Sequence, residues 1–129
     1  MAETYLLDIN ILIYYFNDSL PTSNLDFDSI FRESFNISVI TKIEFLGWNQ
    51  FNEQQFQIAE KVIHAAKILH LNEDIATHTI KLRRQSNIKI PDAIIAATGV
   101  VHHLTLITRN EKDFQKIRNL NILNPFAKG

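Results

Sequence analysis

Cysteine is absent from this sequence, and glycine and proline occur only three times each. Without cysteine the chain cannot form disulfides, thiolate nucleophiles or cysteine-based zinc sites. Glycines at only three positions, 47, 99 and 129, cannot build a glycine-rich phosphate-binding loop. The lack of cysteine also fits a reducing compartment, so we expect the protein to be cytoplasmic.

Long apolar runs are missing as well. No stretch approaches the roughly 20 apolar residues that a membrane-spanning helix needs. The first residues include acids at Glu3 and Asp8, so they lack the basic start and the unbroken apolar stretch of a signal peptide. We therefore expect no membrane partner and no export by that route.

The sequence has no excess of basic residues, since its formal net charge is -1. Modules that bind nucleic acids usually carry a net positive charge. Any nucleic acid would therefore have to be held locally. A metal ion in an acidic pocket can supply positive charge that the side chains lack.

What the chain does contain is typical of one soluble domain. It has 129 residues, of which 46% are hydrophobic and 21% are charged. This is enough to bury a substantial core but too little for two domains. We therefore expect a single domain that comprises residues 1–129.

Short apolar runs alternate with stretches of helical periodicity. We predict strands over residues 5–7, 36–40, 104–107 and 121–123, and helices over 9–16, 52–69, 72–84 and from Pro91 onward. The turn-rich segment 17–28 is predicted to be a loop that opens a helix toward Phe31. Strands that alternate with helices pair in parallel. The prediction is an α/β three-layer sandwich with a central, mostly parallel sheet flanked by helices.

Acidic residues lie where such a sheet places its ligands, beyond the carboxyl ends of the strands. Asp8 directly follows the first predicted strand, and the segment 108–113 follows the strand at 104–107. Asp92 begins a predicted helix, and Glu44 lies three residues after Thr41, a candidate helix cap. If the fold gathers these carboxylates, they should hold protons or bind a cation, and oxygen ligands suit Mg²⁺.

Each acid also has a purely structural explanation. An aspartate in the first turn of a helix stabilises that helix by about 0.3 to 1 kcal/mol, which alone would account for Asp92. Glu44 would complete a capping box with Thr41. The residues taken singly therefore leave open whether these acids are structural or catalytic.

The acids stand in motifs that span the chain from about residue 5 to residue 125. These motifs are Leu7-Asp8-Ile9-Asn10 with Ile11-Leu12-Ile13, then Ser38-Val39-Ile40-Thr41 leading to Glu44, and finally Pro91-Asp92-Ala93 with Ala96-Ala97 and Leu106-Ile107-Thr108-Arg109-Asn110-Glu111-Lys112-Asp113-Phe114. In this order they resemble the PIN-domain family, in particular the VapC-like toxins of bacterial and archaeal toxin-antitoxin pairs. The last motif is the most specific.

The resemblance implies an endoribonuclease that uses Mg²⁺ or Mn²⁺ to hydrolyse a phosphodiester bond and leave a 5′-phosphate. The implied metal ligands are Asp8, Asp92 and Asp113. Glu44 would support a water, Asn10 the acidic cluster and Thr108 the substrate phosphate. Many relatives carry an acid where Asn110 stands here, so we expect one metal ion rather than two.

The implied partners are an RNA substrate and an antitoxin protein. Four aromatic residues, Phe45, Trp48, Phe51 and Phe56, lie close together in the sequence, and most of them should be core. As an alternative, which the resemblance to toxins implies, Trp48 and Phe51 line a groove for a partner helix. A homodimer would use a similar surface.

Cationic residues near the last two acidic motifs are candidates for holding RNA phosphates. They are Lys81, Arg83, Arg84, Lys89, Arg109, Lys112, Lys116 and Arg118. Ordinary solvated helix ends explain them equally well. Arg109 is the best single candidate, because it lies inside the last acidic motif.

Other functions fit the sequence less well. A phosphatase of the haloacid dehalogenase kind needs a second aspartate two places after the first, where Asn10 stands. A response-regulator receiver needs an acid pair near the first strand and a phosphoacceptor, and this sequence lacks the pair and shows no clear phosphoacceptor between Asp8 and Asp92. A zinc site is not expected either, because the histidines lack zinc-site spacing. Two alternatives of the same fold remain, a non-catalytic module that binds RNA or protein, and a housekeeping RNA-processing nuclease.

Overall fold

The computed structural model describes residues 4–126, and its centre is one parallel β-sheet. The strands are β1 (Tyr5–Leu7), β2 (Asn36–Ser38), β3 (Lys67–Leu69), β4 (Thr105–Ile107) and β5 (Asn121–Leu123). They pair in the order β3-β2-β1-β4-β5, and every pairing is parallel. Strand β1 therefore lies in the middle of the sheet, between β2 and β4.

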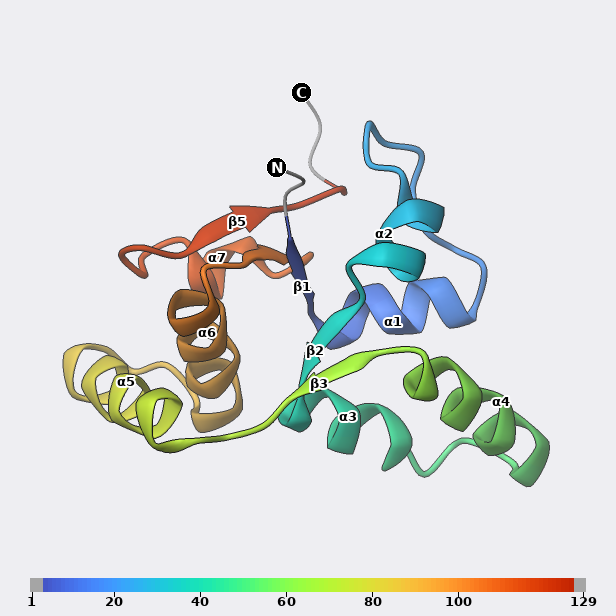
Figure 1. Ribbon diagram of the computed structural model, residues 1–129, viewed down its shortest axis with the longest axis horizontal. Helices are drawn as coiled ribbons and strands as arrows, with labels where there is room; N and C mark the ends of the chain where they lie inside the picture. Colours follow the sequence, from blue (N-terminus) through green and yellow to red (C-terminus); the bar gives the residue numbers. More distant parts are fainter. Residues whose placement is uncertain (1–3, 127–129) are drawn as a thin grey trace.

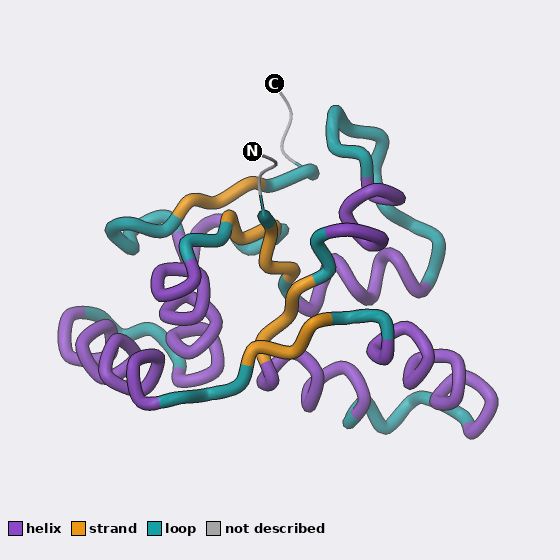
Figure 2. The backbone as a smooth tube through the Cα atoms, in the orientation of Figure 1, coloured by secondary structure: helices purple, strands orange, loops and turns teal. Residues whose placement is uncertain are grey.

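Helices cover both faces of this sheet (Figure 1). They are α1 (Ile9–Phe16), α2 (Phe27–Glu33), α3 (Val39–Leu46), α4 (Glu53–His64), α5 (Glu73–Gln85), α6 (Ile90–His102) and α7 (Glu111–Phe114). Figures 1 and 2 show α1 to α4 on one side of the sheet and α5 to α7 on the other. The α/β three-layer sandwich predicted from the sequence is thus confirmed, and its sheet is wholly parallel across residues 4–126.

Neighbouring residues of the central strands point to opposite faces, as the two-residue period of a strand requires. Leu7 and Ile107, which pair across β1 and β4, belong to the core beneath α1, α2 and α4. Leu6 and Leu106, one residue earlier, belong to the core beneath α6 and α7. All four are fully buried. Burial on both faces is typical of a parallel sheet and explains why these strands read as continuous apolar runs.

The predicted helix over residues 52–69 is wrong in its last part. Helix α4 ends at His64, and Lys67–Leu69 forms strand β3 instead. This strand pairs with β2, with Ile37 opposite Ile68. The helical period continues through Ala66 and Leu69 in the sequence, so only the long-range pairing with β2 distinguishes strand from helix here.

The strand predicted over residues 36–40 is shorter in the structure, where it ends at Ser38, and the N-cap predicted for the helix that follows it is wrong. Ser38 is the N-cap of α3, and its hydroxyl accepts a hydrogen bond of 3.1 Å from the backbone N–H of Ile40. Thr41 lies inside the helix, fully buried, and its hydroxyl has no hydrogen-bond partner within residues 4–126. The capping box proposed for Thr41 and Glu44 therefore does not exist.

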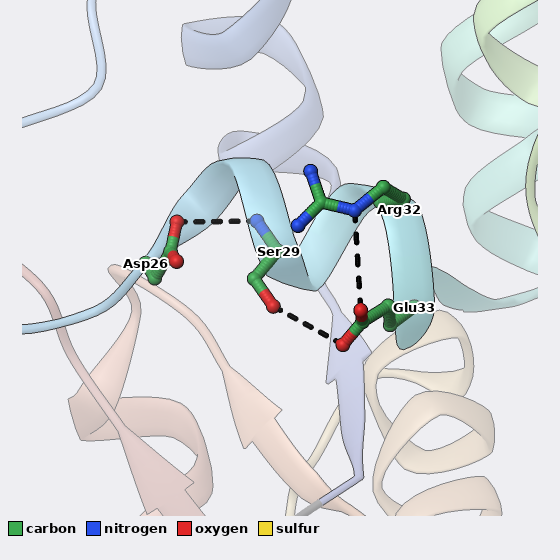
Figure 3. A network of polar contacts seen from close by, with 4 residues as sticks. All are labelled: Asp26, Ser29, Arg32 and Glu33. Carbon is green, nitrogen blue, oxygen red and sulfur yellow. Dashed lines mark hydrogen bonds and ion pairs between the residues drawn. The ribbon is translucent and has the colours of Figure 1, made fainter.

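Helix α2 begins at an aspartate cap at the end of the predicted loop (Figure 3). Asp26 Oδ1 accepts a hydrogen bond of 3.1 Å from the backbone N–H of Ser29. The Ser29 hydroxyl donates to Glu33, which also lies 3.9 Å from Arg32. The Arg32 and Glu33 side chains are 65% and 68% exposed, so their pairing adds at most about 1 kcal/mol. It is the only ion pair within residues 4–126.

None of the helices in the described part of the chain is both long and apolar enough to cross a membrane.

Candidate active site

The topology of the sheet places one crevice at the carboxyl ends of β1 and β4. From β1 the chain passes through α1 and α2 to β2, on one side of β1. From β3 it passes through α5 and α6 to β4, on the other side of β1. Ligands of open parallel sheets bind at such a reversal of strand order, beyond the strand ends. Asp8 follows β1 and Thr108 follows β4, so both stand at this crevice.

Asp8 is almost completely buried, with 5% of its surface exposed. It is the N-cap of α1, and its Oδ1 accepts a hydrogen bond of 2.8 Å from the backbone N–H of Ile9. Its Oδ2 accepts a hydrogen bond of 2.7 Å from the Thr108 hydroxyl. Burial raises the pKa of Asp8 above its usual range, and these two hydrogen bonds oppose that rise.

A chain of hydrogen bonds leads from Asp8 to Asp113. The hydroxyl of Thr108, which donates to Asp8, accepts a hydrogen bond of 2.9 Å from the backbone N–H of Asn110. The Asn110 side-chain amide donates at 2.6 Å to Oδ2 of Asp113, in α7. Two of the four candidate acids are therefore joined through the loop between β4 and α7. Asn110 orients a carboxylate here.

Glu44 lies in the second turn of α3 and has no capping role, because Ser38 caps that helix. Partial burial, followed by the negative charges of Asp8 and Asp92, raises its pKa. This places Glu44 within electrostatic reach of two acids that are far away in the sequence. The structural explanation available from the sequence, a capping box, is therefore removed for this residue.

Asp92 lies in the first turn of α6, behind Pro91, as the sequence predicts. Burial raises its pKa, the charges of Asp8 and Asp113 raise it further, and Lys89 opposes the rise. An aspartate that merely stabilised a helix N-terminus would have a lowered pKa, because the helix dipole favours its charged form. The net rise indicates that neighbouring acids and burial dominate at Asp92.

The four candidate acids thus come from four different places in the chain and act on each other electrostatically. The raised pKa values agree with the expectation that gathered acids hold protons or bind a cation.

The donor set of this site suits a hard divalent cation. It offers carboxylates, an amide and a hydroxyl, but neither thiolate nor imidazole, and oxygen ligands select Mg²⁺ or Mn²⁺. Within residues 4–126 no three acidic or histidine side chains form a ready-made ligand group. Mg²⁺ commonly uses only one or two carboxylates together with water and substrate phosphate, so the residues present fit it.

Asn10 and Arg109, the two remaining candidates, differ in their surroundings. Asn10 is half-buried in the first turn of α1, and no hydrogen bond links its side chain to an acid within residues 4–126. The guanidinium of Arg109 lies 5.4 Å from the Tyr14 ring centroid and 4.7 Å from that of Phe126. It also donates a hydrogen bond to the Tyr14 hydroxyl. The sequence did not predict these contacts of Arg109 with Tyr14 and Phe126, because no local pattern indicates them.

The four neighbouring aromatic residues divide between core and surface. Phe45 is buried and Phe51 is half-buried, whereas Trp48 is 55% exposed and Phe56 is 36% exposed. Trp48 packs against Phe51 with ring centroids 5.0 Å apart. Together with Glu44 they line a small pocket of about 70 Å³ at the edge of the acidic site.

The parallel sheet and its acidic crevice define an α/β protein with a candidate metal site at the topological switch point. The sequence matches the family model described as PIN domain over residues 5–120. The chain therefore belongs to the PIN domain family, as its motifs predict.

Solved structures agree with this assignment. A chain of a toxin-antitoxin complex from Klebsiella pneumoniae is 31% identical with a TM-score of 0.73, and the match covers 97% of this chain and 100% of that chain. A chain of VapBC-1 from nontypeable Haemophilus influenzae is 26% identical with a TM-score of 0.73, covering 96% and 99%. For DNA-bound VapBC from Salmonella typhimurium, the identity is 21%, the TM-score 0.81 and the coverage 95% and 98%. No curated protein sequence gives a significant match.

Proposed function

We propose that this protein is a metal-dependent endoribonuclease whose single domain spans residues 1–129. One observation carries the proposal. Acids from the end of β1, from α3, from the start of α6 and from α7 influence one another at the switch point of the sheet, and the pKa values of Asp8, Glu44 and Asp92 are raised. No cation of the chain is ion-paired to them within residues 4–126.

In this proposal Asp8, Asp92 and Asp113 hold Mg²⁺ or Mn²⁺, directly or through water. The bound cation supplies positive charge that lowers the pKa of a water and offsets charge developing on the phosphate. Asp8 is fixed in position by two hydrogen bonds, and Asp113 by the amide of Asn110. Preorganised ligands of this kind need little rearrangement during the reaction.

The residues around the acids have supporting roles. Glu44, which is exposed and has no hydrogen-bond partner within residues 4–126, is free to accept a proton from a water near the phosphate. Thr108 is fully buried and both of its hydroxyl contacts are internal, so we assign it to holding Asp8 and the loop to α7. Any contact between Thr108 and substrate would require exchange of one of these bonds.

We further propose that the protein is the toxin of a toxin-antitoxin pair and is bound by an antitoxin. The similarity to chains of toxin-antitoxin complexes supports this. So does the pocket beside Glu44, since an exposed Trp48 at its rim offers an apolar anchor to an amphipathic segment. An adjacent reading frame that encodes a small DNA-binding protein would separate a toxin from a housekeeping RNA-processing nuclease.

The experiment that tests the nuclease is cleavage of structured and unstructured RNA with Mg²⁺, with Mn²⁺ and with a chelator. The wild type is compared with Asp92→Asn and with Asp74→Asn. Asp74 lies in the first turn of α5 just as Asp92 lies in the first turn of α6, but it is exposed, and its charge is not among those that raise the pKa of Asp8, Glu44 or Asp92. We expect cleavage by the wild type and Asp74→Asn only, and only with metal. RNA binding without metal-dependent cleavage would instead indicate a non-catalytic module.

A further inference from the structure

A large groove opens from the acidic site along the face of the sheet that carries α5, α6 and α7. Its volume is about 960 Å³, and its lining includes two of the four acids, Asp92 and Asp113. From there it runs between two walls. One wall consists of α5 and the loop that follows it, and the other consists of α7 and the turn that follows it. The groove is therefore continuous with the candidate active site but extends well beyond it.

Positive charge is concentrated in this groove. Its lining contains five cationic side chains, Lys81, Lys89, Lys112, Lys116 and Arg118, against two carboxylates. The whole chain has 13 lysines and arginines and a net charge of -1, so this excess is local. The cationic side chains lie on both walls, with Lys81 and Lys89 on the wall of α5 and the other three on the wall of α7. None of the five forms an ion pair within the described part of the chain, so their side chains can contact a ligand, although Lys89 already interacts electrostatically with Asp92.

The neutral residues of the lining indicate which part of a nucleic acid the groove would contact. They include amides such as Gln85, Asn87 and Asn119, and aliphatic side chains such as Leu82 and Ile117. No Phe, Tyr or Trp lies in the lining within residues 4–126. Stacking of bases on aromatic rings is the usual way in which proteins hold unpaired bases, whereas lysine and arginine hold phosphates. The groove is thus equipped for a phosphate backbone.

We propose that this groove binds the RNA strand on one side of the cleaved bond through its phosphates and without regard to base. The proposal rests on the proposed nuclease function, since it places the strand beside Asp92 and Asp113. Lysines on both walls then position the backbone so that one phosphate reaches the acids. Any preference for particular bases has to come from contacts outside this groove.

The test measures binding of a labelled single-stranded RNA in the presence of a chelator, over a range of salt concentrations. The groove variants are Lys81→Gln and Lys116→Gln, one from each wall. The controls are Lys61→Gln, on α4, and Lys67→Gln, on β3, which are exposed lysines outside the groove lining. Each groove variant should bind more weakly, and the slope of log affinity against log salt should fall by about 0.7 per lost phosphate contact. The controls should match the wild type.

Homopolymer RNAs of the four bases and a DNA strand of the same sequence complete the test. Similar affinities and salt slopes for all of them support binding through phosphates. Groove variants with wild-type affinity and slope overturn the proposal, as does an equal loss of affinity in Lys61→Gln or Lys67→Gln. Cleavage plays no part in this measurement. If the groove binds RNA but the protein never cleaves it, the nuclease proposal is contradicted and the groove proposal stands. If the protein cleaves RNA but its groove variants bind RNA normally, the groove proposal is contradicted and the nuclease proposal stands.

Discussion

The hydroxyl of Thr108 donates a hydrogen bond of 2.7 Å to the buried carboxylate of Asp8, across a separation of 100 residues in the sequence. This bond joins the ends of the two strands that flank the switch point. It also supports a carboxylate whose pKa burial has raised. The geometry of the candidate site therefore depends on a residue that is itself completely buried.

Replacing Thr108 by valine keeps the shape of the side chain but removes both this donor and the acceptor of the Asn110 backbone N–H. A hydrogen bond to a charged group contributes roughly 1.5 to 3 kcal/mol, so we expect Thr108→Val to lose about that much free energy of unfolding at neutral pH. Denaturant unfolding monitors the loss. Thr108→Ser keeps the hydroxyl and should recover most of it. Equal stability of Thr108→Val and the wild type would mean that the hydrogen bonds of this hydroxyl make no net contribution to the free energy of unfolding.

Asp92→Asn should leave the metal-free protein as stable as the wild type or more stable. The substitution removes a charge that Asp8 and Asp113 repel, and this offsets the loss of a favourable helix-terminal charge. Asp74→Asn, in the first turn of α5, removes only the helix-terminal effect and should cost about 0.3 to 1 kcal/mol. Thermal unfolding of both variants checks this. A marked destabilisation of Asp92→Asn alone would show that Asp92 is structural.

The stability of the metal-free protein should depend on pH through the acidic cluster. A carboxyl group whose pKa is higher in the folded than in the unfolded state contributes stability that is complete below the unfolded pKa. That stability is lost as the pH rises through the folded pKa. Asp8, Glu44 and Asp92 all have raised pKa values. We therefore expect the wild type to lose stability relative to Asp92→Asn as the pH rises from the acidic range toward neutrality.

Denaturant unfolding of both proteins at a series of pH values in a chelator measures this difference. A gap between them that stays constant with pH would exclude repulsion within the cluster as its cause.

Arg109→Ala should loosen the C-terminal segment and weaken the fold. Arg109 contacts the rings of Tyr14 and Phe126, and each such contact is worth about 0.5 to 1 kcal/mol at an exposed site. Hydrogen exchange of the backbone around Phe126 should become faster, and the free energy of unfolding should fall. Its role in binding RNA stays a prediction. If RNA affinity and its salt dependence do not change in Arg109→Ala, that role is to be abandoned.

The sequence predicts those elements whose evidence is local. Helices α1, α5 and α6 show their apolar period or their Pro91 start in consecutive residues, and β1, β4 and β5 are short apolar runs between polar segments. Strand β3 could not be predicted in the same way, because Lys67–Leu69 continues the period of the helix before it. Pairing with β2, some thirty positions away, decides its structure.

In the candidate site, too, features marked by local sequence patterns could be predicted, and features that depend on long-range contacts could not. The positions of Asp8, Asp92 and Thr108 follow from the ends of strands and the start of a helix, which local patterns mark. The partners of these residues do not follow, because the contact of Arg109 with Tyr14 spans 95 residues. The wrong cap at Thr41 has a simpler cause, since Ser38 satisfies the same rule three positions earlier.

The central claim, that the acids form one cation site, is tested most directly by titrating the metal-free protein with Mn²⁺ in a calorimeter. The wild type and Asp74→Asn should bind Mn²⁺ saturably, whereas Asp8→Asn and Asp92→Asn should bind it much more weakly or not at all. No saturable binding by the wild type, or equal binding by Asp92→Asn, would contradict the account.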